Sequence, residues 1–220
     1  MLAIDSRTDE RIEVASLLRV YNVRLPFRMS MIARRGRHIV SGERRRGVLC
    51  AGERVMVGCY RTLHYEGATS IDPRVGYELH LMLQDEAPCT DSLAARIAHA
   101  VFSEPTRDWS IALAAQRMQT GARHITAQLF RENSAFMAIV REQRLMRGLL
   151  TLLAHPHARS DLAGLAAQCG FASAARLDDA FDAHFGSRAS YVARLAWYPA
   201  LTWSFSSAAE SAERNKERNT

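Results

Sequence analysis

The stretch from Leu162 to Gly186 reads LAGLAAQCGFASAARLDDAFDAHFG, and it decides the fold of the C-terminal half of the chain. Its first part carries Leu162, Leu165 and Ala166 at i, i+3 and i+4 spacing, which predicts one apolar helix face. Gly170 supplies a tight break after this helix. Apolar residues of the second part predict another helix packed across the first: Phe171, Leu177 and Phe181. The stretch therefore predicts a helix-turn-helix hairpin.

A second stretch of the same kind lies upstream, from Trp109 to Phe136, and reads WSIALAAQRMQTGARHITAQLFRENSAF. Its first helix repeats that of the other hairpin, with apolar residues at three positions: Ile111, Leu113 and Ala114. Gly121 lies at the turn, and Ile125 and Leu129, at i and i+4, predict the buried face of a second helix. That helix then has four residues on its opposite, outward side: Arg123, Thr126, Ala127 and Arg131.

One continuous helix is predicted between the two hairpins, over residues 136 to 154. The segment FMAIVREQRLMRGLLTLLA contains no proline, and its apolar residues recur at helical spacing. Gly148 inside it costs about 1 kcal/mol of helix propensity relative to alanine. The predicted order is hairpin, linker helix, hairpin.

This order resembles the DNA-binding domain of AraC/XylS-type transcriptional regulators. The family pattern of apolar-x-x-apolar-Ala, three residues, Gly-Phe and an apolar-x-x-x-Phe helix is similar to the second hairpin, from Leu162 to Phe181. The segment REQRLMRGLLTLL resembles the family's Arg-Leu-x-x-Ala-x-x-Leu-Leu stretch, with Gly148 where alanine is usual. The resemblance implies a DNA-binding domain over residues 91–198. Its parts are a first helix-turn-helix at about 109–133, a linker helix at about 135–154 and a second helix-turn-helix at about 161–185.

The resemblance implies a sequence-specific DNA-binding regulator, an activator, that reads major-groove half-sites with both hairpins. The residues that it places toward DNA lie on the two recognition helices: Arg123, Thr126, Ala127 and Arg131 on the first, and Ala174, Ala175 and Arg176 on the second. Arg123 is the best candidate for a base contact, because arginine pairs bidentately with guanine. One alternative stays open, a partner-binding regulator with a degenerate DNA-binding domain.

Acidic residues make the second recognition helix a poor match for DNA. Asp178, Asp179 and Asp182 lie on it, and carboxylates repel a polyanion. The turn after Gly186 also departs from the family pattern, with Tyr191 one place early. We therefore expect the first hairpin to carry most of the base readout, and the second to pack or to contact a partner such as RNA polymerase.

Residues 1–90 differ from the rest and predict a small β-rich regulatory or dimerisation domain. Short apolar runs separated by glycines and charges predict antiparallel strands: Met29 to Ala33, His38 to Val40, Gly47 to Cys50, Arg54 to Tyr60 and Tyr77 to Leu83. The region resembles the cupin-like or partial-barrel domains that precede many AraC-type hairpins, which makes the predicted fold class α+β. Its histidines, His38, His64 and His80, lack the H-x-H spacing of a metal-binding cupin, so no metal is expected.

Composition adds further expectations. The chain is 48% apolar, with a net charge of +6 carried almost wholly by arginine. This charge suits a polyanion, although arginine bias also arises from a GC-rich genome. No run of 18 apolar residues occurs and the N-terminus is charged, so we expect a cytoplasmic protein with no membrane partner. Residues 199–220 are expected to form a disordered tail.

The remaining expectations concern chemistry and partners. The 4 cysteines show no C-x-x-C spacing, which favours free buried thiols. No catalytic grouping or phosphate-binding loop is present, so neither an enzyme nor a cofactor is expected. Double-stranded DNA is the expected partner. RNA polymerase, a small-molecule or protein effector of the N-terminal domain, and a homodimer all stay open.

Overall fold

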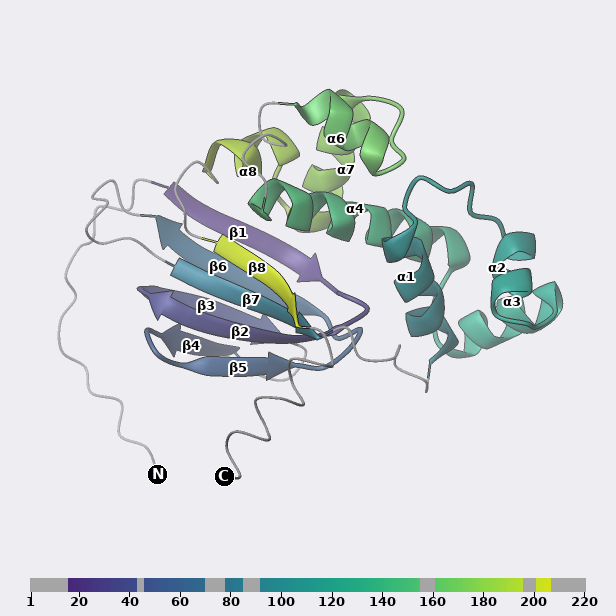
Figure 1. The fold of residues 1–220 in the computed structure, drawn as a ribbon, viewed down its shortest axis with the longest axis horizontal. Coiled ribbons are helices and arrows are strands. Elements are labelled where there is room, and N and C mark those ends of the chain that lie inside the picture. The colour runs from purple at the N-terminus through teal and green to yellow at the C-terminus, as the bar shows by residue number, and fades with distance from the viewer. Residues whose placement is uncertain are drawn as a thin grey trace, which may run out of the picture.

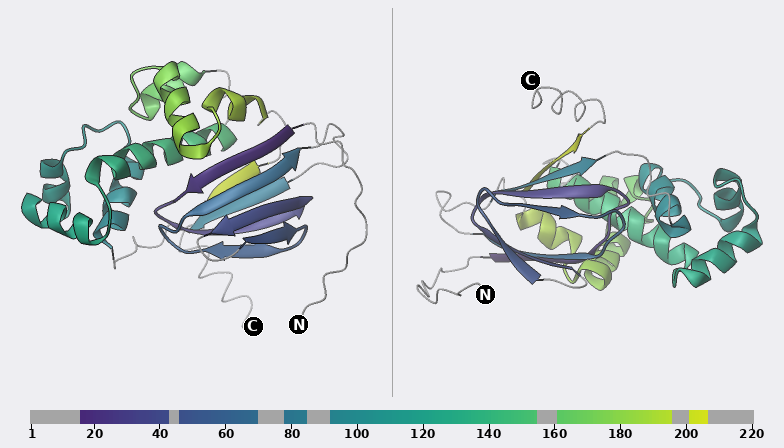
Figure 2. Two further views of the ribbon diagram at one scale, coloured as in Figure 1. Left: turned by 180° about the vertical axis from the view of Figure 1, so that it is seen from behind. Right: turned by 90° about the horizontal axis from the view of Figure 1, so that it is seen from below.

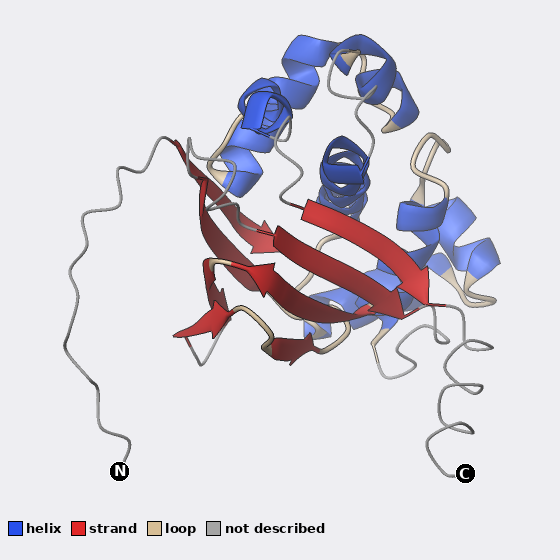
Figure 3. Cartoon of the chain, turned by 60° about the vertical axis from the view of Figure 1, so that its left-hand side comes forward, coloured by secondary structure: helices blue, strands red, loops and turns tan. Residues whose placement is uncertain are grey.

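The chain folds into a β-sandwich followed by helices, which confirms the predicted α+β class (Figure 1). The structure, a computed structural model, describes residues 16–42, 46–69, 78–84, 92–154, 161–195 and 201–206. The sandwich lies at one end of the molecule, and the helices pack along one of its sides and extend beyond it (Figure 3).

Two sheets of 4 strands each form the sandwich, seen from below in Figure 2. The first has the order β1 (Ser16–Val23), β6 (Leu63–Thr69), β3 (Arg37–Gly42), β4 (Arg46–Cys50). The second has the order β5 (Arg54–Val57), β2 (Arg28–Arg35), β7 (Glu78–Gln84), β8 (Leu201–Ser206). Neighbouring strands run antiparallel, except β7 and β8, which are parallel. Buried apolar side chains from both sheets fill the space between them: Val20, Met29, Met31, Leu49, Leu63, Leu79, Leu81 and Leu83.

The five apolar runs singled out in the sequence all overlap strands, namely β2, β3, β4, β5 and β7. Strands β1 and β6 were not predicted. β6 contains Gly67, which looks like a strand breaker in the sequence but is required by packing: a Cβ there would collide with the ring of Tyr65. The hydroxyl group of Tyr65 in turn lies 2.9 Å from Nδ1 of His38, which is completely buried. His38 is thus a core residue of the sandwich.

The prediction of a disordered tail was wrong for Leu201–Ser206. These residues form β8, which pairs in parallel with β7 from Leu79–Leu201 to Gln84–Ser206. The reason is visible in the sequence, because Leu201, Trp203 and Phe205 alternate with polar residues at the period of a strand. Residues 199–200 and 207–220 lie outside the described residues.

Seven helices are described after the sandwich strands β1 to β7: α1 (Leu93–Ser103), α2 (Ile111–Arg117), α3 (Ala122–Arg131), α4 (Phe136–Ala154), α6 (Leu162–Gln168), α7 (Ala174–Phe185) and α8 (Ala189–Leu195). Helix α4 has the same bounds as the linker helix expected from the sequence. One hydrophobic core surrounds α1 to α3 and the start of α4. A second core is shared by the rest of α4, helices α6 to α8 and the sandwich.

The cysteines differ from expectation. Cys59 is disulfide-bonded, so the prediction of free thiols was wrong for it. Cys169 is a free buried thiol, as expected, whereas Cys50 is free but exposed. Cys89 lies outside the described residues. Residue spacing along the chain does not show which cysteines meet in space, which is why the disulfide escaped the sequence analysis.

Candidate nucleic-acid interface

The first hairpin consists of α2 and α3, and hydrogen bonds at the helix ends fix its turn. The side chain of Ser110 caps α2 and accepts a hydrogen bond from the N–H of Leu113 at 3.2 Å. Between the helices, Gln119 adopts a φ of 54° and is the left-handed residue of the turn. Gly121 precedes α3 in an extended conformation. The chain therefore reverses direction at Gln119 and enters α3 at Gly121.

The inner side of this hairpin is apolar. Ala114, Ile125 and Leu129 are buried, as the spacing predicted, and they pack in one core with Trp109. The indole N–H of Trp109 donates to the carbonyl oxygen of Glu104 at 2.9 Å. Ile111, expected in the core, is 36% exposed instead. It lies in the first turn of α2, next to the outer surface of α3.

The outer side of α3 gathers the four residues that the sequence analysis selected on this helix. Arg123, Thr126, Ala127 and Arg131 are all exposed, and they line a shallow hollow of about 810 Å³. The hydroxyl group of Thr126 donates to the carbonyl oxygen of Ala122 at 3.2 Å. We name this surface the α3 face: Ile111, Ala122, Arg123, Thr126, Ala127, Phe130 and Arg131.

Phe130 is the residue of the α3 face that sequence reasoning missed. It is 84% exposed, which is unusual for a phenylalanine, and it lies beside the two arginines of the hollow. The signal was present in the sequence, because the helical period that buries Ile125 and Leu129 places residue 130 outside. An exposed ring on a helix can contact the methyl group of thymine in a major groove.

Glu132 anchors the end of α3 to the start of α1. Its carboxylate accepts hydrogen bonds from Ser92 Oγ at 2.7 Å and from the N–H groups of Leu93 at 3.0 Å and Ala94 at 2.9 Å. Gln128 donates to it as well, at 2.9 Å. Burial disfavours the charge, but these hydrogen bonds outweigh burial, so the pKa of Glu132 lies below its ordinary value.

The second hairpin consists of α6 and α7 and is capped at each helix start. Asp161 accepts from the N–H of Gly164 at 2.7 Å, and Ser173 accepts from the N–H of Arg176 at 3.2 Å. Gly186 ends α7 in the left-handed conformation, with a φ of 70°. The inner face of α7 is completely buried at three apolar positions: Leu177, Phe181 and Phe185.

The outer side of α7 differs from that of α3. Ala175 and Arg176 are exposed, and Ala174 is half-buried. Asp179 and Asp182 are exposed on the same helix. One arginine thus stands against two exposed carboxylates, which disfavours contact with DNA phosphates.

The third carboxylate of α7 has a structural role. Asp178 accepts hydrogen bonds from the backbone N–H of Ser190 at 2.8 Å and from its hydroxyl group at 2.9 Å. These bonds join α7 to the start of α8.

Helix α7 is also fixed to the sandwich, at strand β1. The side-chain amide of Asn22 donates to the carbonyl oxygen of His184 at 2.9 Å, and Nε2 of His184 lies 3.2 Å from the carbonyl oxygen of Asn22. The hydroxyl group of Ser187 donates to the carbonyl oxygen of Arg19 at 2.8 Å. Burial lowers the pKa of His184, which favours a neutral ring that donates to Asn22. The second hairpin is therefore packed firmly against the sandwich, whereas α2 and α3 project away from it (Figure 1).

Arg144 of the linker helix α4 donates hydrogen bonds to the segment before the first hairpin and to the turn of the second. Its guanidinium group donates to the carbonyl oxygens of Pro105 at 2.8 Å and Arg107 at 3.0 Å, which precede the first hairpin. It also reaches the carbonyl oxygen of Gly170, in the turn of the second hairpin, at 3.5 Å. One side chain thus links the segment before the first hairpin to the turn of the second hairpin, and this link was not predicted from the sequence.

Gly148 allows α4 and the second hairpin to approach closely. A Cβ at this position would lie 3.3 Å from Sγ of Cys169 and 3.4 Å from Cε2 of Phe181. The glycine that weakens α4 as a helix therefore has a packing reason.

A partly buried ion pair joins α4 to the sandwich. Arg24 donates to Glu142 twice, from Nε at 2.9 Å and from Nη2 at 2.5 Å. The amide of Gln143 donates to the carbonyl oxygen of Arg24 at 3.0 Å. Arg24 also lies over the ring of Tyr60, 4.4 Å from its centroid. This cluster and the contacts of His184 place the hairpins and the sandwich in a fixed relation.

Two further observations concern other kinds of site. The described residues contain no group of three or more His, Cys, Asp or Glu side chains that could hold a metal ion. Among the described helices, none is long and apolar enough to cross a membrane.

A small β-sandwich followed by two helix-turn-helix hairpins on one linker helix defines a class of two-part α+β fold, and known structures share it. ToxT from Vibrio cholerae O395, bound to (E)-4-(8-methylnaphthalen-1-yl)but-3-enoic acid, matches with a TM-score of 0.57 and 11% sequence identity. The match covers 82% of this chain and 95% of the ToxT chain. ToxT of Vibrio cholerae strain SCE256, bound to an unsaturated fatty acid, matches with a TM-score of 0.54, 13% identity and 80% and 90% of the two chains.

These likenesses establish the fold of the chain. No protein-family model matches the sequence, and a search of curated proteins finds no relative. A DNA-contacting role for the selected residues therefore stays a prediction that rests on the geometry above.

Proposed function

We propose that this chain is a sequence-specific DNA-binding transcriptional regulator of the AraC/XylS type, an activator, in which the first hairpin carries most of the base readout. The observation that carries the proposal is the α3 face. Two arginines, a threonine and an exposed aromatic ring lie on one side of a helix that projects from the molecule. A projecting helix of this kind fits the major groove of B-DNA.

The two hairpins have different outer surfaces, and this difference is the reason for assigning base readout to the first hairpin. The α3 face has two arginines and no carboxylate among its residues. The outer side of α7 has Arg176 beside Asp179 and Asp182. Since phosphate contacts supply much of the affinity for DNA, the first hairpin is the stronger DNA reader. The second hairpin, fixed to β1, then serves as a support and as a surface for a protein partner such as RNA polymerase.

The decisive experiment compares two arginine variants on the same DNA. Genome-wide footprinting of the tagged protein supplies the bound sequence, and fluorescence anisotropy then measures affinity at several salt concentrations. Arg123→Ala is expected to lower affinity by about tenfold or more, because a bidentate contact to guanine is worth about 1–3 kcal/mol. Arg176→Ala is expected to have a much smaller effect. Arg37→Ala, an exposed arginine of β3, serves as the control for net charge.

The outcome separates the two open functions. If Arg123→Ala leaves affinity unchanged while Arg176→Ala abolishes it, the proposed division of labour is wrong. If the wild-type protein binds no duplex at low salt and yields no footprint, the DNA-binding function itself is wrong. The acidic α7 surface would then favour the alternative, a regulator that acts only through protein contacts.

The structure also bears on how the regulator is controlled. ToxT is known with a bound fatty acid, which makes a small apolar effector a natural comparison. In this chain, the apolar cavity between the sheets and α4 measures only about 40 Å³. Ligand pockets measure roughly 300–1,000 Å³. We therefore propose that an effector of this regulator acts on the surface of the sandwich rather than inside it.

A further inference from the structure

Strand β4 forms one edge of the first sheet and β5 forms one edge of the second. In the described ranges no strand pairs with the outer side of either, and these are the open edges of the sandwich. On the other side of the sandwich, α7 and α8 pack against β1, and α4 packs against β8. Unpaired strand edges are ready templates for another strand, and proteins usually cover or block them.

Hydrogen bonds show which backbone groups lie on the open edges. The N–H of Cys50 donates to Oε2 of Glu53 at 2.7 Å, away from β3. Alternate residues of a strand direct their backbone groups to the same side, so those of Val48 and Arg46 also point to the outer edge of β4.

The same reasoning applies to β5. The carbonyl oxygen of Glu53 accepts from the N–H of Ala33, on β2, at 3.1 Å. The backbone groups of the next residue, Arg54, and of Met56 therefore point to the outer edge of β5. Each open edge thus offers both donors and acceptors to an added strand.

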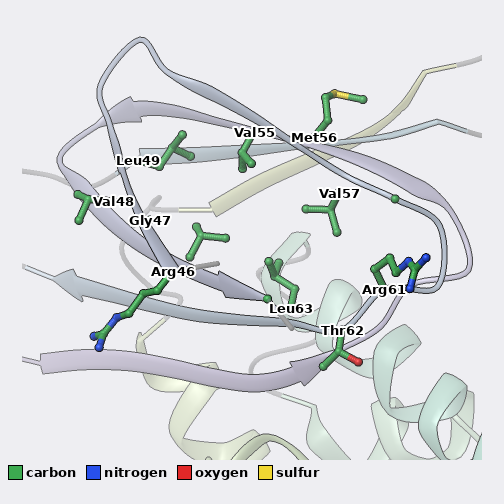
Figure 4. A pocket seen from close by; sticks show the side chains of 13 residues that line it. Arg46, Gly47, Val48, Leu49, Val55, Met56, Val57, Arg61, Thr62 and Leu63 are labelled. Atoms are coloured by element: carbon green, nitrogen blue, oxygen red, sulfur yellow. The ribbon is translucent and has the colours of Figure 1, made fainter. Parts of the chain in front are cut away.

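An apolar groove of about 650 Å³ lies between these edges (Figure 4). Leu49 and Leu63 are buried in its floor, and Val55 and Val57 are half-buried. Val48 on one edge strand is 48% exposed, and Met56 on the other is 54% exposed. The volume falls within the range of about 300–1,000 Å³ that is usual for ligand pockets.

The charge around the groove is positive. Arg46 and Arg61 line it, and Figure 4 shows them on strand β4 and on the chain before β6. Arg54 is exposed on β5. No acidic residue is among the groove-lining residues that the structure describes. The groove therefore suits an occupant that is apolar on one side and anionic on the other.

We propose that this groove docks an extended peptide segment of a partner protein, with acidic and apolar residues in alternation, by strand addition to β4. The segment's backbone pairs with the open edge of β4, its apolar side chains lie over Leu49 and Val57, and a carboxylate faces Arg46. A second copy of this chain fits less well, because it would bring arginines against arginines. The proposal rests on the proposed function in one respect, since the peptide would be the protein effector of the regulator.

The test measures peptide binding directly on the full chain, without DNA. The probe is a fluorescein-labelled peptide of seven residues in which glutamate and valine alternate, and anisotropy reports its dissociation constant. Two control peptides have lysine in place of glutamate, or N-methyl groups on alternate residues, which remove the hydrogen-bond donors of one edge. We expect the glutamate peptide to bind with a dissociation constant in the micromolar range, and each control to bind at least about tenfold more weakly.

Two variants locate the site. Val48→Pro removes one N–H from the open edge without removing a bond to β3, and proline is tolerated at such positions. It is expected to weaken peptide binding at least about tenfold, whereas Val48→Thr, which keeps the N–H, is expected to change it little. Arg46→Glu is expected to weaken binding similarly, and Arg37→Glu makes the same charge change on β3, outside the groove. Thermal unfolding checks that each variant is folded. If Val48→Pro does not fold, Arg46→Glu still tests the site.

Each other outcome overturns the proposal. Equal binding of all three peptides, or no peptide binding by the folded wild type, rules out strand addition. Binding of oleate but not of peptide assigns the groove to a lipid, and concentration-dependent dimerisation that Arg46→Glu abolishes assigns it to a second copy. The DNA measurement is separate: a chain that binds DNA but no peptide contradicts this inference alone, and one that binds peptide but no DNA contradicts the proposed function.

Discussion

A single exposed ring distinguishes the α3 face from an ordinary basic surface. We expect Phe130→Ala to lower affinity for the bound DNA sequence by about tenfold through loss of thymine contacts. The salt dependence should not change, because no charge is removed. Since Phe130 is 84% exposed, the free energy of unfolding should change by less than about 0.5 kcal/mol. Anisotropy over a salt series and urea denaturation measure both quantities.

Met137→Ala is the matched control for this prediction. Met137 is 64% exposed on α4 and is not part of the α3 face. Its replacement should leave affinity unchanged. Equal losses for the two variants would mean that exposed apolar area in general, rather than the α3 face, contributes to DNA binding.

One glycine of the second hairpin lies where a side chain would be both strained and crowded. Gly170 has a φ of +73°, and a Cβ there would lie 2.9 Å from the carbonyl oxygen of Pro105 and 3.0 Å from the guanidinium group of Arg144. We expect Gly170→Ala to lower the free energy of unfolding by about 2 kcal/mol or more, from left-handed strain and from crowding.

Urea denaturation tests this prediction against Gly47→Ala, a site in β4 with no atom within 4 Å of the added Cβ. The control should be as stable as the wild type. A Gly170→Ala protein of wild-type stability would show that the turn can relax and that Arg144 does not need its present position.

At the scale of elements, the carboxylate of Glu132 links the last turn of α3 to the first turn of α1, and this link depends on pH. The lowered pKa means that the folded state binds a proton on Glu132 less readily than the unfolded chain does. The stabilisation is therefore complete above the ordinary pKa of 4.5 and is lost as pH falls through the lower folded-state value. Glu132→Gln should lower the free energy of unfolding at pH 7, and the gap to the wild type should narrow below about pH 4.5.

Urea denaturation of both proteins between pH 7 and pH 3 measures this gap. Asp182→Asn, at an exposed position of α7, is the control for the loss of one carboxylate. If the difference in free energy of unfolding between the wild type and Glu132→Gln stays constant with pH, then the charge of Glu132 does not contribute to the link between the two helices.

The helical elements could be predicted from the sequence because their information is local. The period that buries Ile125 and Leu129 also fixes which side of α3 faces outward, so the four selected residues lie together as expected. Elements that depend on distant partners were missed. Strand β6 contains a glycine needed by the ring of Tyr65, and β8 pairs with β7, which is far from it in the sequence.

Part of the candidate site could not be predicted from the sequence, because it too depends on residues that are distant in the chain. Arg144 is one of many arginines in the chain, and nothing near it in sequence indicates that it bonds to Pro105 and Gly170. The acidic residues of α7 could be read from the sequence. The hydrogen bonds between Asn22 and His184 could not, because they join residues that are far apart in the chain. These contacts decide which hairpin is free to project, and only the three-dimensional fold brings them together.

At the scale of the whole molecule, the sandwich and the second hairpin share one hydrophobic core, and the first hairpin has another. Helix α4 runs through both. Helix α4 therefore connects the sandwich with the first hairpin. The pair of Arg24 and Glu142 is one of the contacts between α4 and the sandwich, beside the shared hydrophobic core.

The final prediction concerns that pair. The side chain of Glu142 is 10% exposed and that of Arg24 is 32% exposed, so removing the arginine leaves a carboxylate that is largely cut off from water. We expect Arg24→Ala to lower the free energy of unfolding by about 2 kcal/mol, less than for a fully buried pair because solvent reaches the arginine. The double variant Arg24→Met with Glu142→Leu should recover most of this loss, since an apolar pair leaves no buried charge. Urea denaturation measures all three proteins, with Arg107→Ala, in an exposed pair with Glu104, as a control without measurable effect. A double variant as unstable as Arg24→Ala would show that Arg24 acts mainly through its packing on Tyr60, and that the tie between sandwich and linker helix is apolar rather than ionic.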